Sequence, residues 1–287
     1  MRRRMRHPGG STIGVVHPGA MGAAVGAAAT AGGARVCWAS KGRGDATRDR
    51  ARAAGLHDLG DLATLAAGVD ILLSVCPPGA AEEVAGQVAA TGFTGVYVDA
   101  NAIAPATALR VGSVVAGRAR FVDGGIVGPP PRRAGTTRLY LSGPEAGRVA
   151  ALFEGTALSA IVLPGPAGQA SALKTCYATY TKGTSALLAT ILGLARHHQV
   201  EDALLAEWAM SIPSLVEQAT TGPGRAAPRA WRFVGEMEEL ASAFRDAGLP
   251  DGVPVAAAEV YRRLASFKDQ DPPSLDDVLA ELAAEPS

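Results

Sequence analysis

The segment Thr12–Gly22, which reads TIGVVHPGAMG, decides the fold class of this chain. A short apolar run rich in β-branched residues, Thr12–Val16, leads directly into a glycine-containing loop, and an alanine-rich helical pattern follows the loop. This succession of strand, loop and helix is typical of the first unit of a doubly wound parallel sheet, in which a dinucleotide places its pyrophosphate at the start of the helix. The sequence therefore predicts a dinucleotide-binding domain in its first part.

The loop departs from the usual fingerprint, in which three glycines follow the pattern G-x-G-x-x-G. His17 occupies the first glycine position, and Gly19 and Gly22 keep the second and the third. Amides at the start of the helix still favour an anion, because the helix dipole is positive at that end. A βα turn with glycines kept only for packing is the alternative. The residues expected to hold the cofactor at this loop are His17, Pro18, Gly19, Ala20, Met21 and Gly22.

The end of the second predicted strand indicates which nicotinamide cofactor fits. An acidic residue about 20 positions after the glycines would hydrogen-bond the ribose of NAD. The chain has none there and offers Ser40, Lys41 and Arg43, a hydroxyl and two cations that suit a ribose phosphate. NADP (NADPH) is therefore favoured over NAD, with a solvated basic loop as the alternative. Cys76 and Pro77, which directly follow the next predicted strand, are also expected cofactor contacts.

The pattern along the chain changes near Pro164–Gly168. Before this point, short β-branched runs alternate with alanine-rich segments, as in βαβ units that build a parallel sheet. The expected strands are Thr12–Val16, Arg35–Trp38, Asp70–Val75, Val96–Asp99, Phe121–Ile126, Leu139–Ser142 and Ile161–Leu163. After this point only helical patterns follow. They run over Gln169–His197, Glu201–Met210, Ile212–Ala219, Trp231–Ala247, Val253–Phe267 and Ser274–Ala284.

The predicted fold class is thus α/β, with an N-terminal Rossmann-type doubly wound sheet and an all-helical C-terminal domain. The expected domains are residues 1–165, which bind NADP, and residues 166–287, which contribute to the substrate site and to dimerisation.

The charge balance and the hydropathy pattern exclude several classes of partner. Lys plus Arg and Asp plus Glu both number 27, so the chain has no global basic field for nucleic acid or an anionic membrane. No run of about 18 apolar residues is present, which argues against a membrane span. The arginine-rich start, Met1–His7, is expected to be a solvated tail rather than a targeting signal.

The three cysteines and the few histidines argue against metal and disulfide chemistry. Cys37, Cys76 and Cys176 are far apart and form no C-x-x-C pair, so we expect a reducing compartment and a cytoplasmic protein. His197 and His198 are more typical of a helix end than of a metal site, and no metal ligand is predicted.

Four segments of the chain carry a resemblance to a known family. They read PGAMG over residues 18–22, VDANAIAP over 98–105, FVDGGIVG over 121–128 and GQASALK over 168–174. Together they resemble the β-hydroxyacid dehydrogenase and 6-phosphogluconate dehydrogenase superfamily. Asn101 stands where that family has serine, and Ala178 stands where it commonly has asparagine, four residues after its lysine. These departures indicate a divergent phosphogluconate-dehydrogenase-like branch, so the family does not name the substrate.

The resemblance implies that Lys174 is the catalytic lysine, and its sequence context supports this role. Lys174 is a lone cation in an apolar helical stretch, where burial would lower its pKa and let it exchange a proton near neutrality. Tyr177 and Thr181 share its helical face and are expected to orient the substrate. A lysine that only reaches from the core to solvent is the alternative. Lys182, turned about 80° away on the helix, is the reserve candidate.

The remaining substrate contacts are expected at the carboxyl ends of the strands, where open α/β sheets bind ligands. They are Asn101, Gly125 and Gly128, with a turn or helix-capping role for Asn101 as the alternative.

The resulting prediction is an NADP-dependent dehydrogenase or reductase that moves a hydride between nicotinamide and a small hydroxy acid, sugar acid or related carbonyl compound. An imine reductase of the same architecture and a protein that binds NADP without turnover are the alternatives. The resemblance also implies a homodimer.

Overall fold

The computed structural model describes residues 11–284. The chain divides after Lys174 into two compact units, and we describe each by itself. The sequence pattern changes near Pro164–Gly168, a little earlier than this division. The difference arises because helix α7, Gln169–His197, begins in the first unit and continues into the second. The arginine-rich start of the chain, for which a solvated tail is expected, lies outside the described residues.

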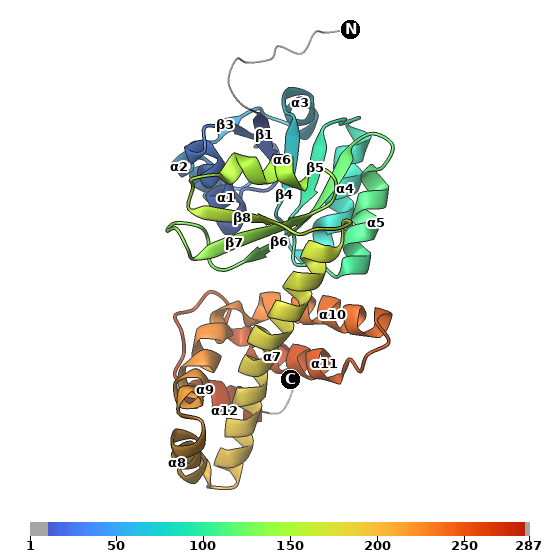
Figure 1. Ribbon diagram of the computed structural model, residues 1–287. Coiled ribbons are helices and arrows are strands. Elements are labelled where there is room, and N and C mark those ends of the chain that lie inside the picture. The colour runs from blue at the N-terminus through green and yellow to red at the C-terminus, as the bar shows by residue number, and fades with distance from the viewer. Residues whose placement is uncertain (1–10, 285–287) are drawn as a thin grey trace. The chain divides into compact units, whose positions relative to one another are not determined.

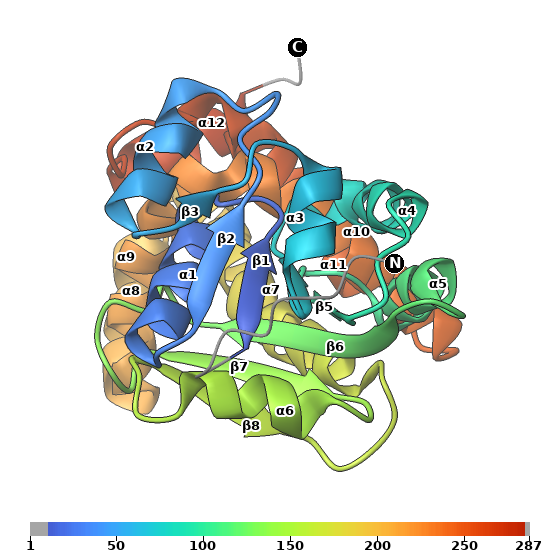
Figure 2. The same ribbon diagram turned by 90° about the horizontal axis from the view of Figure 1, so that it is seen from above.

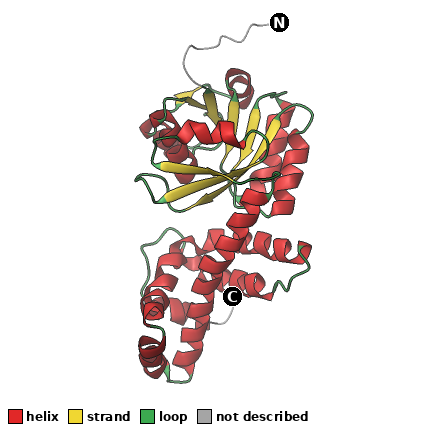
Figure 3. Ribbon diagram, viewed as in Figure 1, coloured by secondary structure: helices red, strands yellow, loops and turns green. Residues whose placement is uncertain are grey.

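The first unit is built on one eight-stranded sheet with the strand order β3-β2-β1-β4-β5-β6-β7-β8 (Figures 2 and 3). All neighbouring strands are parallel except β6 and β7, which are antiparallel. The order reverses beside β1, so the carboxyl ends of β1 and β4 lie at the switch point where such sheets bind ligands. The strands are β1 Thr12–Val15, β2 Arg35–Trp38, β3 His57–Asp58, β4 Ile71–Ser74, β5 Val96–Asp99, β6 Arg120–Val127, β7 Thr137–Ser142 and β8 Leu158–Val162.

Both faces of this sheet are covered by helices, which explains why its central strands are continuous apolar runs. Side chains of α1, α2 and α6 pack with one face, and side chains of α3, α4 and α5 pack with the other (Figures 1 and 2). These helices are α1 Ala20–Ala31, α2 Asp45–Ala53, α3 Leu62–Gly68, α4 Ala81–Ala90, α5 Pro105–Val115 and α6 Ala146–Ala150, with the short helices η1 Pro78–Ala80 and η2 Ala151–Phe153. The predicted doubly wound sheet is confirmed.

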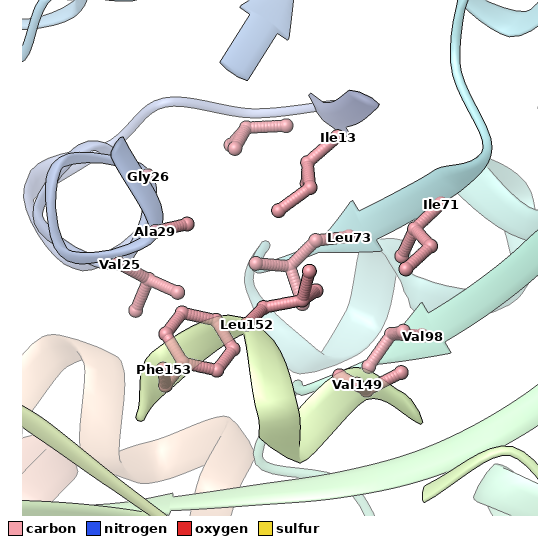
Figure 4. A pocket seen from close by; sticks show the side chains of 11 residues that line it. Ile13, Val25, Gly26, Ala29, Ile71, Leu73, Val98, Val149, Leu152 and Phe153 are labelled. Carbon is pink, nitrogen blue, oxygen red and sulfur yellow. The ribbon is translucent and has the colours of Figure 1, made fainter. Parts of the chain in front are cut away.

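A pocket lies inside the first of these two layers, between α1, the sheet and the η2 turn (Figure 4). Its lining is apolar and includes Val25, Leu73 and Phe153. Because no polar group projects into it, the pocket is a packing feature of the core and not a place for a charged cofactor.

Up to residue 284, where the description ends, the second unit contains helices and no strand, as the sequence predicts. After the shared helix α7 come α8 Glu201–Ser211, α9 Pro213–Ala226, η3 Ala227–Arg229, α10 Ala230–Asp246, α11 Gly252–Arg263, η4 Leu264–Phe267 and α12 Leu275–Ala283 (Figure 1). Buried residues such as Met237, Tyr261 and Leu192 form its two apolar clusters. Helix α12 begins with a capping box, in which Ser274 and Asp277 satisfy each other's backbone amides.

Helix α9 is longer than the sequence predicts. The pattern ends at Ala219 because Gly222, Pro223 and Gly224 break helices. The helix nevertheless continues to Ala226 with Pro223 inside it. Pro223 and Gly224 are buried, and a Cβ at Gly224 would lie 2.5 Å from the carbonyl oxygen of Pro273. Tertiary packing against the Pro273 loop therefore overrides the local helix propensity.

Among residues 11–284, no helix combines the length and the apolar character that crossing a membrane requires.

Candidate active site

The predicted phosphate loop joins β1 to α1 in the first unit. Gly19 is the N-cap of α1, and no side chain caps the first amides of this helix. A Cβ at Gly19 would meet no atom within 4 Å, whereas a Cβ at Gly22 would lie 2.3 Å from the carbonyl oxygen of His17. Gly22 is thus required for helix–strand packing, and Gly19 leaves open space in front of amides that can bind an anion.

Two nitrogen atoms beside this loop are buried without a hydrogen-bond partner in the described part of the chain. They are Nδ1 of His17 and Nε of Arg43. Burial, and secondly the positive charge of Arg43, lower the pKa of His17 to about 4, so His17 is neutral at physiological pH. Buried polar atoms normally have a partner, and a phosphate-bearing ligand at this place would supply one for the guanidinium.

The loop after β2 is held in a defined shape by Arg48. Its Nε donates to the carbonyl oxygen of Arg43 at 3.1 Å, and one of its terminal nitrogens donates to the carbonyl oxygen of Ser40 at 3.2 Å. Lys41 is exposed. The structure adds an acid that the sequence analysis did not identify here, because Asp58 of β3 pairs with Trp38 in register. Burial raises the pKa of Asp58, but hydrogen bonds from Ser40 and Gly60 outweigh this effect and lower the pKa below its ordinary value. Asp58 therefore lies beside Ser40 at the end of β2.

A buried polar network links the carboxyl ends of β4 and β5. Asn101 is 2% exposed, and its side-chain oxygen accepts from the backbone amide of Cys76 at 2.6 Å. Its side-chain nitrogen donates to Asp99 at 2.7 Å and to the Ser74 hydroxyl at 3.3 Å. Asn101 thus fastens the segment that carries Cys76 and Pro77 to the neighbouring strand end. Its role as a substrate ligand stays a prediction.

Burial raises the pKa values of the acidic groups in this network and so favours their neutral forms. Burial raises the pKa of Asp99 to about 7 and the pKa of Cys76 to about 11. Tyr97, fully buried on the same strand as Asp99, has its pKa raised as well, chiefly by burial.

Lys174 lies one turn into the part of α7 that packs on β6. A Cβ at Gly125 of β6 would lie 3.0 Å from Cβ of Lys174 and 2.7 Å from the carbonyl oxygen of Ala170. Burial lowers the pKa of Lys174 to about 8, and no carboxylate within residues 11–284 lies at ion-pair distance from it. Its pKa therefore lies closer to neutrality than that of an ordinary lysine.

The two glycines predicted to bind substrate each have a packing reason. Gly125 allows α7 to approach the sheet, and Gly128 has a φ of 116° with a hypothetical Cβ 2.3 Å from the carbonyl oxygen of Thr136. Their substrate contacts stay predictions. The structure also assigns Asp123, Ser142 and Ser171 to this region, three side chains to which the sequence analysis gave no role. The available signal was a lone acid in an otherwise apolar strand.

The other predicted residues of α7 belong to the second unit. Tyr177 is 44% exposed, and the Thr181 hydroxyl donates to the carbonyl oxygen of Tyr177 at 3.1 Å. Lys182, the reserve candidate, forms an ion pair with Glu236 of α10, and its amine lies 4.4 Å from the ring centre of Phe233. Orientation of substrate by Tyr177 and Thr181 stays a prediction.

Comparison with protein families and curated proteins finds two partial matches. A model described as "Domain of unknown function (DUF1932)" matches residues 195–264, which lie in the second unit. An uncharacterized 28.5 kDa protein of Methanothermus fervidus, encoded in a 7S RNA 5′ region, is 29% identical over 165 residues. The match covers 58% of this chain and 63% of that protein, which is less than two thirds of its length.

Solved structures cover nearly the whole chain. A conserved hypothetical protein from Sinorhizobium meliloti is 25% identical with a TM-score of 0.72, covering 95% of this chain and 96% of its own. The 3-hydroxyisobutyrate dehydrogenase of Mycobacterium tuberculosis, solved with L-serine, is 18% identical with a TM-score of 0.70, covering 96% and 99%. A reductive aminase from Aspergillus terreus, solved with NADPH and ethyl levulinate, is 19% identical with a TM-score of 0.54, covering 94% and 98%. These likenesses show the fold.

Proposed function

Because the chain has the fold of the 3-hydroxyacid dehydrogenase-like proteins, as its sequence motifs predict, we propose that it is an NADP-dependent oxidoreductase. The substrate class is a small hydroxy acid, a sugar acid or a related carbonyl compound. The observation that carries this proposal is Lys174, a half-buried lysine without an acidic partner in the described residues, whose pKa is lowered by burial to about 8.

The residues of the phosphate loop fit a nicotinamide dinucleotide. Uncapped amides at the start of α1 and the open space at Gly19 suit its pyrophosphate, and the unpartnered Nε of Arg43 suits a phosphate. When bound, the nicotinamide supplies the hydride or accepts it. Support for NADP over NAD comes from Arg43 and Lys41, the two cations of the loop after β2, whereas Ser40 lies beside the Asp58 carboxylate.

Lys174 moves the proton that accompanies the hydride. In reduction its ammonium donates to the developing alkoxide oxygen, and in oxidation its neutral amine accepts the proton of the substrate hydroxyl. A pKa of about 8 places both forms within reach near neutral pH, since the most efficient acid or base has a pKa close to the working pH.

The direct test combines cofactor titration with a substrate panel. We expect NADPH to bind more tightly than NADH, and Arg43→Ala to weaken NADPH by about tenfold or more with little effect on NADH, since a charge-assisted hydrogen bond contributes about 1.5–3 kcal/mol. Arg50→Ala, which removes an exposed arginine of α2, is the matched control. Equal affinities for the two cofactors in the wild type would contradict the NADP assignment.

The panel separates this proposal from its two alternatives. Hydroxy acids, sugar acids, aldehydes and imines are offered with both cofactors, and the absorbance of the reduced nicotinamide is followed. Turnover of imines alone would favour imine reduction, for which the shared fold with the Aspergillus terreus reductive aminase is the supporting observation. Tight NADPH binding with no turnover of any compound would favour a binding protein without activity.

The second unit supports the proposal of a homodimer. Tyr180, Leu187 and Leu194 are 68%, 56% and 61% exposed and follow each other at seven-residue spacing on α7. Such a stripe of large apolar side chains on one helix face is typical of an interface between helices. Light scattering is expected to report twice the mass of 29.1 kDa, and a stable monomer at micromolar concentration would contradict this proposal. The cytoplasmic location stays a prediction.

A further inference from the structure

We propose that Asp123 is a positioning residue, which fastens the first turn of α7 to β6 and thereby sets the place of Lys174. The inference deepens the proposed function and rests on it for the role of Lys174. It concerns a side chain that touches neither substrate nor cofactor in the proposal.

The Asp123 carboxylate is fully buried and accepts four hydrogen bonds. Its Oδ2 accepts from the amides of Gly168 at 2.9 Å and Ser171 at 3.0 Å, and from the Ser142 hydroxyl at 2.9 Å. Its Oδ1 accepts from the Ser171 hydroxyl at 2.5 Å. A buried carboxylate with this many donors is well satisfied and holds its partners in a fixed geometry.

These bonds replace the local capping that a helix start normally needs. The first amides of a helix have no partner within the helix, and a side chain just before the helix commonly accepts from them. In α7 the acceptor comes instead from a strand 45 residues away for Gly168 and 48 residues away for Ser171. The amide of Ala170 is taken by the Ser142 hydroxyl at 3.1 Å, which itself donates to Asp123.

The same strand touches the helix at Lys174. Gly125 lies two residues after Asp123 on β6, on the same face of the sheet, and a Cβ there would lie 3.0 Å from Cβ of Lys174. Ser171 and Lys174 are one helical turn apart. A movement of the first turn away from Asp123 therefore carries Lys174 with it and admits more water to its half-buried amine.

A buried aspartate on a neighbouring strand does not by itself form hydrogen bonds to α7. Asp99 is the register partner of Asp123 on β5 and is equally buried. Asp99 accepts from the amide and the side chain of Asn101, in the loop that follows its own strand. Of these two paired aspartates, Asp123 is the one that bonds to α7.

The test measures Lys174 directly. Its reaction with an amine-acylating reagent is followed across pH by peptide mass spectrometry, which reports its pKa without any substrate, and kcat and KM are measured alongside. The variants are Asp123→Ala, Asp123→Asn and Ser171→Ala, with Val122→Ala as control because Val122 is a buried β6 residue of the apolar core. Asp123→Asn keeps the shape but loses the charge and one acceptor oxygen, so it keeps the test decisive if Asp123→Ala does not fold.

We expect Asp123→Ala to lower kcat by about 10²-fold, the cost of a misplacement near 1 Å, with KM for NADPH nearly unchanged. The pKa of Lys174 is expected to rise by about one unit, because water reaches the amine. Asp123→Asn and Ser171→Ala are expected to shift both quantities in the same direction by less, and Val122→Ala to lower stability without moving the pKa.

Unchanged titration of Lys174 in folded Asp123→Ala or Asp123→Asn would overturn the proposal, as would an equal shift in Val122→Ala. A failure of the proposed function looks different. If Lys174→Ala keeps full turnover while the Asp123 variants still shift the titration of Lys174, the positioning role stands and the catalytic role of the lysine is wrong.

Discussion

The two lysines of α7 have opposite surroundings, although they lie on one helix. Lys174, in the first unit, is half-buried beside β6 with no acid at ion-pair distance in the described residues, and its pKa is lowered to about 8. Lys182, in the second unit, forms an ion pair with Glu236 and lies over the ring of Phe233. The comparison shows that one amine of α7 is paired with a carboxylate, whereas the other has no acidic partner in the described residues and a lowered pKa.

Lys182 and its backbone carbonyl connect α7 to two other helices of the second unit, α10 and α11. The side chains of Lys182 and Glu236 are 16% and 10% exposed, and the Tyr261 hydroxyl donates to the carbonyl oxygen of Lys182 at 2.8 Å. A carboxylate in contact favours the charged amine, and the aromatic ring stabilises it further. Within residues 11–284, Lys174 has no such partner, and burial lowers its pKa to about 8.

The largest expected effect separates the two lysines by activity. Lys174→Ala should lower kcat by about 10²- to 10⁴-fold while NADPH affinity stays within a few-fold, because a positioned acid or base acts in the transition state. Lys174→Arg should not restore the rate, since a guanidinium keeps its proton near neutral pH. Steady-state turnover on the best substrate of the panel provides the measurement.

The control for this prediction is Lys182→Ala, which should retain most of the turnover at a temperature where it is folded. Near wild-type turnover in Lys174→Ala, or loss of activity in Lys182→Ala alone, would contradict the catalytic role proposed for Lys174. The tyrosines Tyr177 and Tyr180 would then become the better candidates for the proton donor.

The second-largest expected effect is on the free energy of unfolding. Lys182→Ala should lower the free energy of unfolding by about 3 kcal/mol or more, because it leaves the buried Glu236 carboxylate without its partner. Urea unfolding followed by circular dichroism measures the change. Unfolding of the two units in separate steps would require a fit to each transition.

A double variant shows whether the loss comes from the unpaired charge. Lys182→Met combined with Glu236→Leu should recover most of the stability lost in Lys182→Ala, since replacing a whole buried ion pair by apolar side chains is often neutral. A double variant no more stable than Lys182→Ala would mean that the ion pair itself, and not the orphaned acid, carries the stabilisation.

Much of the fold was predictable because its signals are local. The apolar run of Thr12–Val15 and the glycines of the following loop lie within one short segment, and the same holds for each buried strand. Strand β3 escaped prediction because His57–Asp58 is short and exposed, so it leaves no apolar pattern. The second half of α9 escaped because packing of Gly224 against Pro273 decides it.

The sequence singles out candidate site residues only where one residue type differs from its surroundings. Lys174 stands out as a cation in an apolar helix, and Gly22 as a glycine in a known pattern. The contacts of Asp123 link residues up to 48 positions apart, and the contact of Asp58 with Ser40 depends on strand order. Neither leaves a periodic or spaced signal, so both required the structure.

The smallest expected effect concerns the stability contributed by Lys174 itself. Its pKa is about 8 in the folded protein against an ordinary value of 10.5, so folding disfavours its charged form. Below pH 8 both states hold the proton, and the folded state carries the full cost of the buried charge. Between pH 8 and 10.5 the unfolded state binds more protons than the folded state, so the stability of the wild type rises with pH through this window.

Replacing Lys174 by methionine removes that buried charge while keeping the side chain's length. Lys174→Met should therefore raise the free energy of unfolding by about 1–3 kcal/mol near neutral pH, the scale of a shift of this size for a group partly reached by solvent. The gain should shrink as the pH rises from 8 towards 10.5, because the folded wild-type amine is then neutral and the cost of removing the proton from the unfolded amine falls. Lys182→Met is the matched control and should destabilise at both ends of the range, since its ammonium is paired with Glu236. Urea unfolding of each variant is compared with that of the wild type at about pH 7 and at about pH 9.5. A loss of stability in Lys174→Met near neutral pH, or a gain that does not change with pH, would show that its amine is not a buried, unpaired charge.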